Sequence, residues 1–318
     1  MQAKRRTLLA AMASLPLAAR AAPSHGWQPR RPVDMLISYP VGGGADNIGR
    51  ALASQITTQQ KGWEIIPMNK PGGGGLIFLR ALSEAQPNGG TIGICLSSQL
   101  TFPPDGARTQ AFELANYTLL GAVATSYLTI IVKSKGPITS IDTFRAFAKK
   151  KGAVSIAVSP TFSWISNALS DSLGVPVIGV VYKGAGEYLP ALVGGHVDLV
   201  LWAGGTQQLE AAGTIDVIAT VAPQRMPGAP SVSTLKESGI PVEVESHFIM
   251  LAPKGMDTNI ADVLIDVVAE AAQNAVFQNR MEALLGRPAR YIPPNELAPL
   301  IEAQQKVAVE YESQYRER

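Results

Sequence analysis

A glycine-rich segment between Tyr39 and Asp46 is the part of the chain best suited to bind an anion. It contains three consecutive glycines between a predicted strand and a predicted helix. Because glycine has no side chain, backbone N–H groups there can approach a ligand closely at the positive end of the helix dipole. The candidate ligand-binding residues in this segment are Tyr39, Gly42, Gly43, Gly44, Ala45 and Asp46. The alternative is that the glycines only form a tight turn.

This segment does not match a nucleotide-binding loop. No Gly-Lys-Ser/Thr sequence follows it, and Asn47 stands where a dinucleotide-binding loop has its last glycine. A second glycine run, Gly72–Gly75, fails the same test because Ile77 occupies that position. We therefore expect a small oxyanion at the first segment and no nucleotide cofactor.

Two further turns between a predicted strand and a predicted helix carry polar groups. The hydroxyls of Ser159, Thr161 and Ser163 could bind a ligand or simply cap the helix that follows. The second turn contains Gly184, Ala185 and Gly186. Glu187 comes next, where its charge complements the dipole in the first helical turn, so we do not assign it a catalytic role.

The motifs of common enzymes are absent from the sequence. There is no G-x-S-x-G elbow, no H-E-x-x-H and no set of kinase motifs. The three histidines, His25, His196 and His247, show no metal-binding spacing and no arrangement that would pair a base with a nucleophile. We expect no catalytic residue and no metal. Cys95 is the one cysteine and is predicted to be a small buried side chain.

Short apolar runs that alternate with helical patterns predict an α/β fold. Residues 33–38 form a buried strand, and after the glycines Ile48, Ala51, Leu52 and Ile56 share one helical face. Further strands are predicted at 64–67, 91–96, 129–132, 154–158, 177–181, 197–201 and 216–221. Further helices are predicted at 141–150, 163–173, 187–193, 260–276 and 296–311, with Asp257 or Thr258, and Asn295, as caps of the last two.

Length and composition limit the class of protein. A chain of 318 residues is long enough for two domains, and 46% hydrophobic against 16% charged residues indicates a folded chain. The formal net charge is +2 and the basic residues are not clustered, so nucleic acid is not an expected partner.

The first 21 residues have the features of a signal peptide. Lys4, Arg5 and Arg6 precede the short apolar stretch 8–19, and Ala19-Arg20-Ala21 offers a cleavage site. Export into the periplasm is therefore expected. Arg5-Arg6 with the residues that follow resembles a twin-arginine signal, while a general secretory signal also carries basic residues here.

An ordered series of short motifs resembles the Bug/TctC receptors of tripartite tricarboxylate transporters. The series runs from about Trp27 to the C-terminus. Its pieces are 27–32, Asp46 with Arg50, 69–75, 87–91, 182–184, 192–198, 233–239 and 251–255. Departures from the usual family pattern occur at Asn88, Ser233, 164–166 and Glu187. They leave the fold expectation intact and concern the identity of the ligand.

The resemblance implies a type II periplasmic-binding-protein fold, in which two α/β lobes enclose a ligand cleft. We place lobe one at residues 27–127 and 249–318, and lobe two at 128–248. The chain would then be a monomeric receptor that captures a small carboxylate for the membrane permease subunits of a transporter. Ser97 and Ser98 would assist the glycine segment, and Ser159, Thr161, Ser163 and the 184–186 turn would close over the ligand from lobe two.

Two other functions stay open at this point. A receptor of the same kind could act as a sensor for a signalling protein, which the sequence does not distinguish from a transport receptor. An exported hydrolase or transferase would need a base beside a nucleophile.

Because the glycine segment and the Ser159–Ser163 turn contain no lysine or arginine, neutral donors would hold the anion, which favours mono- or dicarboxylates over citrate-like triacids.

Overall fold

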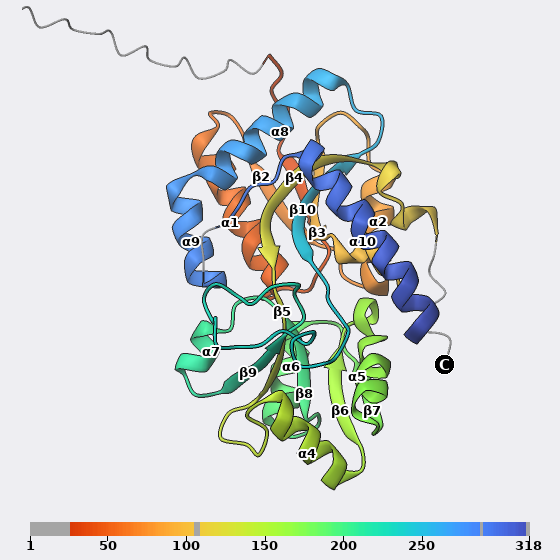
Figure 1. Ribbon diagram of the computed structural model, residues 1–318. Coiled ribbons are helices and arrows are strands. Elements are labelled where there is room, and N and C mark those ends of the chain that lie inside the picture. Colours follow the sequence, from red (N-terminus) through yellow and green to blue (C-terminus); the bar gives the residue numbers. More distant parts are fainter. Residues whose placement is uncertain (1–25, 105–108, 287–288, 316–318) are drawn as a thin grey trace, which may run out of the picture.

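The chain folds into two α/β units, each built on a five-stranded sheet (Figure 1). The computed structural model describes residues 26–104, 109–286 and 289–315. The expected signal peptide, residues 1–21, lies outside the described residues. None of the described helices is both long and apolar enough to cross a membrane.

The first sheet has the strand order β2-β1-β3-β10-β4. Strands β1, β2 and β3 are parallel, and β10 runs antiparallel between β3 and β4. The strands are β1 (Val33–Ile37), β2 (Ile65–Asn69), β3 (Thr91–Leu96), β4 (Tyr117–Ser126) and β10 (Ser246–Pro253). They are rich in isoleucine, valine and leucine because helices cover both faces of such a sheet.

The second sheet repeats this arrangement with the order β7-β6-β8-β5-β9. Strands β6, β7 and β8 are parallel, and β5 runs antiparallel between β8 and β9. The strands are β5 (Leu128–Lys133), β6 (Val154–Val158), β7 (Val177–Val181), β8 (Leu199–Ala203) and β9 (Ile215–Thr220). Loops at the carboxyl ends of parallel strands share one edge of their sheet, and such edges bind ligands in α/β folds.

Helices cover the faces of both sheets (Figure 1). With the first sheet are α1 (Gly44–Gln59), α2 (Leu76–Ser83), α3 (Ser98–Thr101), α8 (Thr258–Gln273), α9 (Ala275–Leu285) and α10 (Pro294–Tyr315). With the second are α4 (Ile141–Lys151), α5 (Ile165–Leu173), α6 (Ala185–Val193) and α7 (Gln207–Ala211). Short 3-10 turns occupy Gly73–Gly75, Gln110–Phe112, Leu114–Asn116 and Pro160–Phe162.

The chain passes between the two sheets more than once. Tyr127 alone separates β4 from β5, and the segment 221–245 leads from β9 back to β10. The last helix, α10, extends from beside the first sheet towards the second (Figure 1). Near its end Tyr311 packs on Trp164, with 4.9 Å between ring centroids, and Tyr315 belongs to the same buried core cluster as the second sheet.

Most predicted elements are present, with three corrections. The strand predicted at 197–201 lies two residues later, as β8. The helix predicted at 260–276 is two helices, because Asn274 has extended backbone angles and its side chain caps α9 by accepting a hydrogen bond from Val276 N. Asn295 lies inside α10, which begins at Pro294, and does not cap it. Asp257 caps α8 as expected.

Candidate functional site

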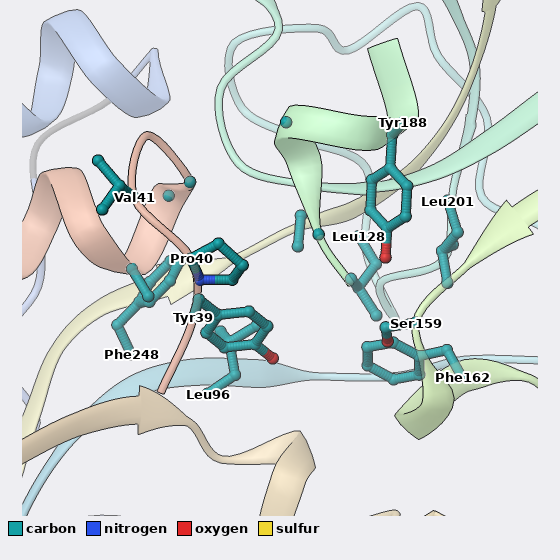
Figure 2. A pocket seen from close by; sticks show the side chains of 16 residues that line it. Tyr39, Pro40, Val41, Leu96, Leu128, Ser159, Phe162, Tyr188, Leu201 and Phe248 are labelled. Carbon is teal, nitrogen blue, oxygen red and sulfur yellow. The ribbon is translucent and has the colours of Figure 1, made fainter. Parts of the chain in front are cut away.

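The N-termini of α1 and α6, one from each unit, line a common chamber between the two sheets. We call it the α1–α6 chamber; Gly43 and Gly44 form one side and Gly184 and Gly186 the other. Figure 2 shows Tyr39 and Pro40 on the first side and Tyr188 opposite them, with its hydroxyl directed towards Ser159. The remaining walls are Val41, Ala45, Leu96, Leu128, Phe162, Leu201, Ala203 and Phe248.

A buried carboxylate fixes the glycine segment at the start of α1. One oxygen of Asp46 accepts a hydrogen bond from the backbone N–H of Gly42 at 2.9 Å. The other accepts from Arg50 Nε and Asn69 Nδ2, each at 2.8 Å. Because the Asp46 side chain is only 3% exposed and already has three partners, its carboxylate holds the loop in shape and does not face the chamber.

The first turn of α1 leaves backbone donors unused. Asn47 N donates to Gly43 O, which is the first bond of the helix. Within the described residues no hydrogen bond occupies the backbone N–H of Gly44, Ala45 or Asp46. Unpaired N–H groups and the positive end of the dipole make this turn a site for a negatively charged group.

The second unit supplies a similar turn and two hydroxyl groups. Gly184 is the N-cap of α6, whose first residue is Ala185, and Ser159 is the N-cap of the 3-10 turn Pro160–Phe162. Ser159 forms a side-chain hydrogen bond with Tyr188. These groups are donors of the kind that a carboxylate accepts.

The two tyrosines of the chamber stay protonated. Burial raises the pKa of Tyr188 well above its ordinary value, and the same cause raises the pKa of Tyr39. Both hydroxyls are therefore neutral donors throughout the physiological range. None of the chamber walls carries a charged side chain among the described residues.

Glycine at two positions allows the units to approach one another. A Cβ atom on Gly44 would lie 3.3 Å from the Ala203 carbonyl oxygen, and one on Gly184 would lie 3.3 Å from Pro40 Cδ. The α1–α6 chamber between them has a volume of about 50 Å³, room for a group the size of a carboxylate.

A larger chamber adjoins the first and shares Tyr39, Pro40 and Ser159 with it. We call it the α2 chamber, because the glycine run Gly72–Gly75 before α2 forms one wall. Its volume is about 470 Å³, and its other walls are Ser38, Pro71, Gln99, Pro160, Thr161, Val181, Tyr182, Lys183 and Glu187.

The structure brings most of the predicted site residues to these two chambers. Those on a chamber wall are Tyr39, Gly43, Gly44, Ala45, Ser159, Thr161, Gly184 and Gly186. Gly42 and Asp46 are not wall residues of either chamber, and they are bonded to each other. Ala185 begins α6.

Three predicted serines lie away from both chambers. Ser97 Oγ accepts a hydrogen bond from His247 N at 3.0 Å, which joins β10 to the end of β3. Ser98 is fully buried in α3, and Ser163 Oγ donates to the carbonyl of Pro160 within its own turn. None of the three serines is a wall residue of either chamber.

Several wall residues were not predicted as ligand-binding. Tyr188 and Gln99 lie inside helices α6 and α3, where the sequence shows ordinary helical positions. The run Gly72–Gly75 belongs to one of the motifs that resemble the receptor family, but the sequence does not assign it a ligand-binding role. Its position after a parallel strand of the same sheet as β1 was the signal that could have placed it beside Tyr39.

Among the described residues, neither chamber has a histidine or a cysteine in its walls. His247 is buried on β10, with Nδ1 3.2 Å from Thr125 Oγ1, and lines neither chamber. No group of three or more metal-binding side chains occurs among the described residues.

Comparison with known proteins agrees with this architecture. A family model described as tripartite tricarboxylate transporter family receptor matches residues 48–286. A "UPF0065 protein in gbd 5'region" of Cupriavidus necator is 30% identical over 281 residues, 83% of this chain and 82% of that protein.

Solved structures show the same fold. The periplasmic binding protein BugD superposes with a TM-score of 0.80 at 27% identity, covering 90% of this chain and 98% of its own. An R. palustris protein solved with adipate superposes with a TM-score of 0.79 at 22% identity, covering 90% and 97%. The fold is that of a two-lobed periplasmic binding protein, and the chain belongs to the receptor family of the tripartite tricarboxylate transporters.

Proposed function

We propose that this receptor binds a small carboxylate in the α1–α6 chamber and delivers it to the membrane permease subunits of a tripartite tricarboxylate-type transporter. The observation that carries the proposal is the meeting of two helix N-termini, those of α1 and α6, at one chamber whose described walls carry no charged side chain. Such a chamber offers backbone N–H groups and hydroxyls to a single anionic group.

The donors at the chamber are sufficient for useful affinity. A hydrogen bond to a charged group contributes about 1.5–3 kcal/mol, whereas a micromolar complex needs about 8 kcal/mol. A few contacts from Gly44 N, Ala45 N and the hydroxyls therefore suffice. Neutral hydrogen-bond donors stabilise one carboxylate well but do not offset the repulsion among several adjacent negative charges. This favours mono- or dicarboxylates over triacids. The structural neighbour solved with adipate supports this class of ligand.

We also propose how the chain is divided and where it acts. Residues 27–127 with 249–318 form lobe one and residues 128–248 form lobe two; the two sheets and the single-residue link at Tyr127 support this division.

A signal peptide cleaved after Ala21 directs the monomeric receptor to the periplasm, as its membership of a family of periplasmic proteins supports. Replacing Arg5 and Arg6 by lysine blocks export if the route is twin-arginine and leaves it unchanged if it is the general secretory route.

Binding without catalysis fits the site better than a hydrolase or transferase function. The described walls of the two chambers contain no histidine or cysteine, and the hydroxyl of Ser159 is bonded to a neutral tyrosine and not to a base.

Native mass spectrometry of the protein purified from its own periplasm tests the proposed function. The expected result is a complex whose extra mass corresponds to a small carboxylate, lost when Gly43 is replaced by valine. A retained ligand without a carboxylate, or a carboxylate retained equally by both proteins, would contradict the proposal.

A further inference from the structure

Five aromatic side chains from both units pack together beside the α1–α6 chamber. We call this group the aromatic clasp; it consists of Phe102, Phe162, Trp164, Tyr311 and Tyr315. Phe102 follows α3 of the first unit, and the two tyrosines lie in the last turns of α10. Phe162 and Trp164 lie between β6 and α5 of the second unit. All but Tyr311 are at most 3% exposed, so the clasp is a shared piece of core between the units.

Trp164 is the centre of the clasp. Its ring is stacked with that of Phe102, with 5.3 Å between the centroids and 18° between the planes. The Tyr311 and Tyr315 rings lie 4.9 and 6.2 Å from it. Aromatic pairs at such distances stabilise a structure beyond the area that they bury. Three rings of the first unit therefore hold one ring of the second.

Two hydrogen bonds reinforce the end of α10. The Tyr311 hydroxyl oxygen accepts a bond from Glu243 N at 3.0 Å, and Asn167 Nδ2 donates to the Tyr315 carbonyl oxygen at 2.6 Å. Glu243 belongs to the segment 221–245, which carries the chain back from the second sheet to the first, and Asn167 lies in α5. The last turns of α10 are thus bonded both to a passage between the units and to a helix of the second unit.

The clasp is connected to the α1–α6 chamber through Phe162. This side chain lines the chamber (Figure 2), and its ring centroid lies 6.1 Å from that of Phe102. A rotation that opens the chamber either separates the clasp or draws the end of α10 along with the second unit. Separation exposes buried aromatic surface to water. The other route must bend α10, which has no proline after Pro299 to kink it. The clasp therefore opposes opening by either route.

We infer that the aromatic clasp is a strap that keeps the ligand-free receptor partly closed. The inference goes beyond the proposed function, because it concerns the receptor before any ligand binds. A strap of this kind raises the fraction of molecules in the closed arrangement, and the apparent affinity for any ligand of that arrangement rises by the same factor.

Small-angle X-ray scattering of ligand-free protein tests this inference. The samples are unfolded in urea, dialysed and refolded, and native mass spectrometry verifies that no ligand remains. Tyr311→Ala removes one ring from Trp164 and the acceptor of Glu243 N, and we expect a larger radius of gyration than in the wild type. Tyr291→Ala is the control. It makes the same change at another half-buried tyrosine of the first unit, whose hydroxyl donates to the Leu120 carbonyl oxygen at 3.0 Å, and it should keep the wild-type radius.

Hydrogen exchange separates opening of the lobes from unfolding of the second unit. In Tyr311→Ala we expect the amides of β6 and α5 to exchange as slowly as in the wild type, because these elements keep their own core. The amide of Glu243 should exchange faster, because it has lost its acceptor.

A gentler variant decides the question if Tyr311→Ala unfolds the second unit. Tyr311→Phe combined with Asn167→Ala removes both hydrogen bonds of the α10 end and keeps every ring of the clasp. We again expect a larger radius of gyration than in the wild type. An unchanged radius in a folded Tyr311→Ala protein, or in the double variant if Tyr311→Ala does not fold, would overturn the inference. An equal increase in Tyr291→Ala would overturn it as well.

Discussion

Gly43 has the backbone angles of an ordinary extended residue, with φ −77° and ψ 170°, so its missing side chain and not its flexibility matters for binding. A Cβ at this position would meet only the Pro40 carbonyl oxygen, at 3.5 Å. Gly43→Val is therefore compatible with the fold and places methyl groups at the chamber wall. We expect it to weaken carboxylate binding at least about 100-fold in calorimetry, with little change in melting temperature.

The loss of carboxylate binding in Gly43→Val is to be compared with that in Lys183→Ala. The Lys183 side chain is exposed at the other chamber, so its removal should weaken binding less than about tenfold, or about 1.4 kcal/mol. If Lys183→Ala abolishes binding while Gly43→Val is tolerated, a side-chain cation recognises the ligand and backbone recognition is wrong.

The sequence predicts single residues of the chamber best where backbone N–H groups, and not side chains, would contact the ligand. Gly43, Gly44 and Gly184 line the α1–α6 chamber, and the sequence points to them because glycines between a strand and a helix indicate a close approach. Ser97 lines neither chamber, and its hydroxyl accepts a hydrogen bond from His247 N, which lies 150 positions away in the sequence. The direction of a hydroxyl depends on such distant contacts, which no local pattern contains.

At the scale of elements, Asp46 makes the start of α1 rigid. Asp46→Ala would leave the Gly42 N–H, the Arg50 guanidinium and the Asn69 amide without their acceptor. We expect the free energy of unfolding to fall by about 2–4 kcal/mol, measured by urea titration.

Asp142→Ala is the control for this prediction. Asp142 is also in the first turn of a helix, α4, but it is exposed, so only a dipole effect of less than about 1 kcal/mol is expected. Equal losses in the two variants would show that Asp46 acts only through the helix dipole and not by fixing the loop.

The elements themselves were predictable to different degrees. Short apolar strands such as β3, β6 and β7 lie at the predicted residues, because continuous apolar runs bounded by turns leave few alternatives. Strands β4 and β10 were not predicted. They pair antiparallel with each other across long sequence separation, with register shifts, and long-range pairing overrides local preference.

At the scale of the whole molecule, buried thiol and phenol groups make stability depend on pH. Burial raises the pKa of Cys95, Tyr39 and Tyr188, and raises the pKa of Tyr291 to about 12. Above about pH 8.5 the unfolded chain loses its thiol proton while the folded protein keeps it, so the unfolded state binds fewer protons. The free energy of unfolding should be flat near neutrality and fall as pH rises.

Urea titrations between neutral pH and about pH 10 check this dependence. Each group that titrates only in the unfolded state lowers the free energy of unfolding by up to about 1.4 kcal/mol per pH unit. Cys95→Ala should remove the part of the decline that begins near pH 8.5 and leave the later part due to tyrosines. An identical decline in this variant would contradict the role of the buried thiol.

The whole-molecule arrangement also decides how the ligand is held. Because α1 and α6 belong to different sheets, a ligand bound to both N-termini must draw the two units together. Small-angle X-ray scattering of protein stripped of ligand, before and after addition of the carboxylate identified by mass spectrometry, measures this directly. We predict a smaller radius of gyration with the ligand for the wild type and no change for Gly43→Val. An unchanged radius in a wild-type sample that was verified as ligand-free and then saturated would contradict binding between the two units.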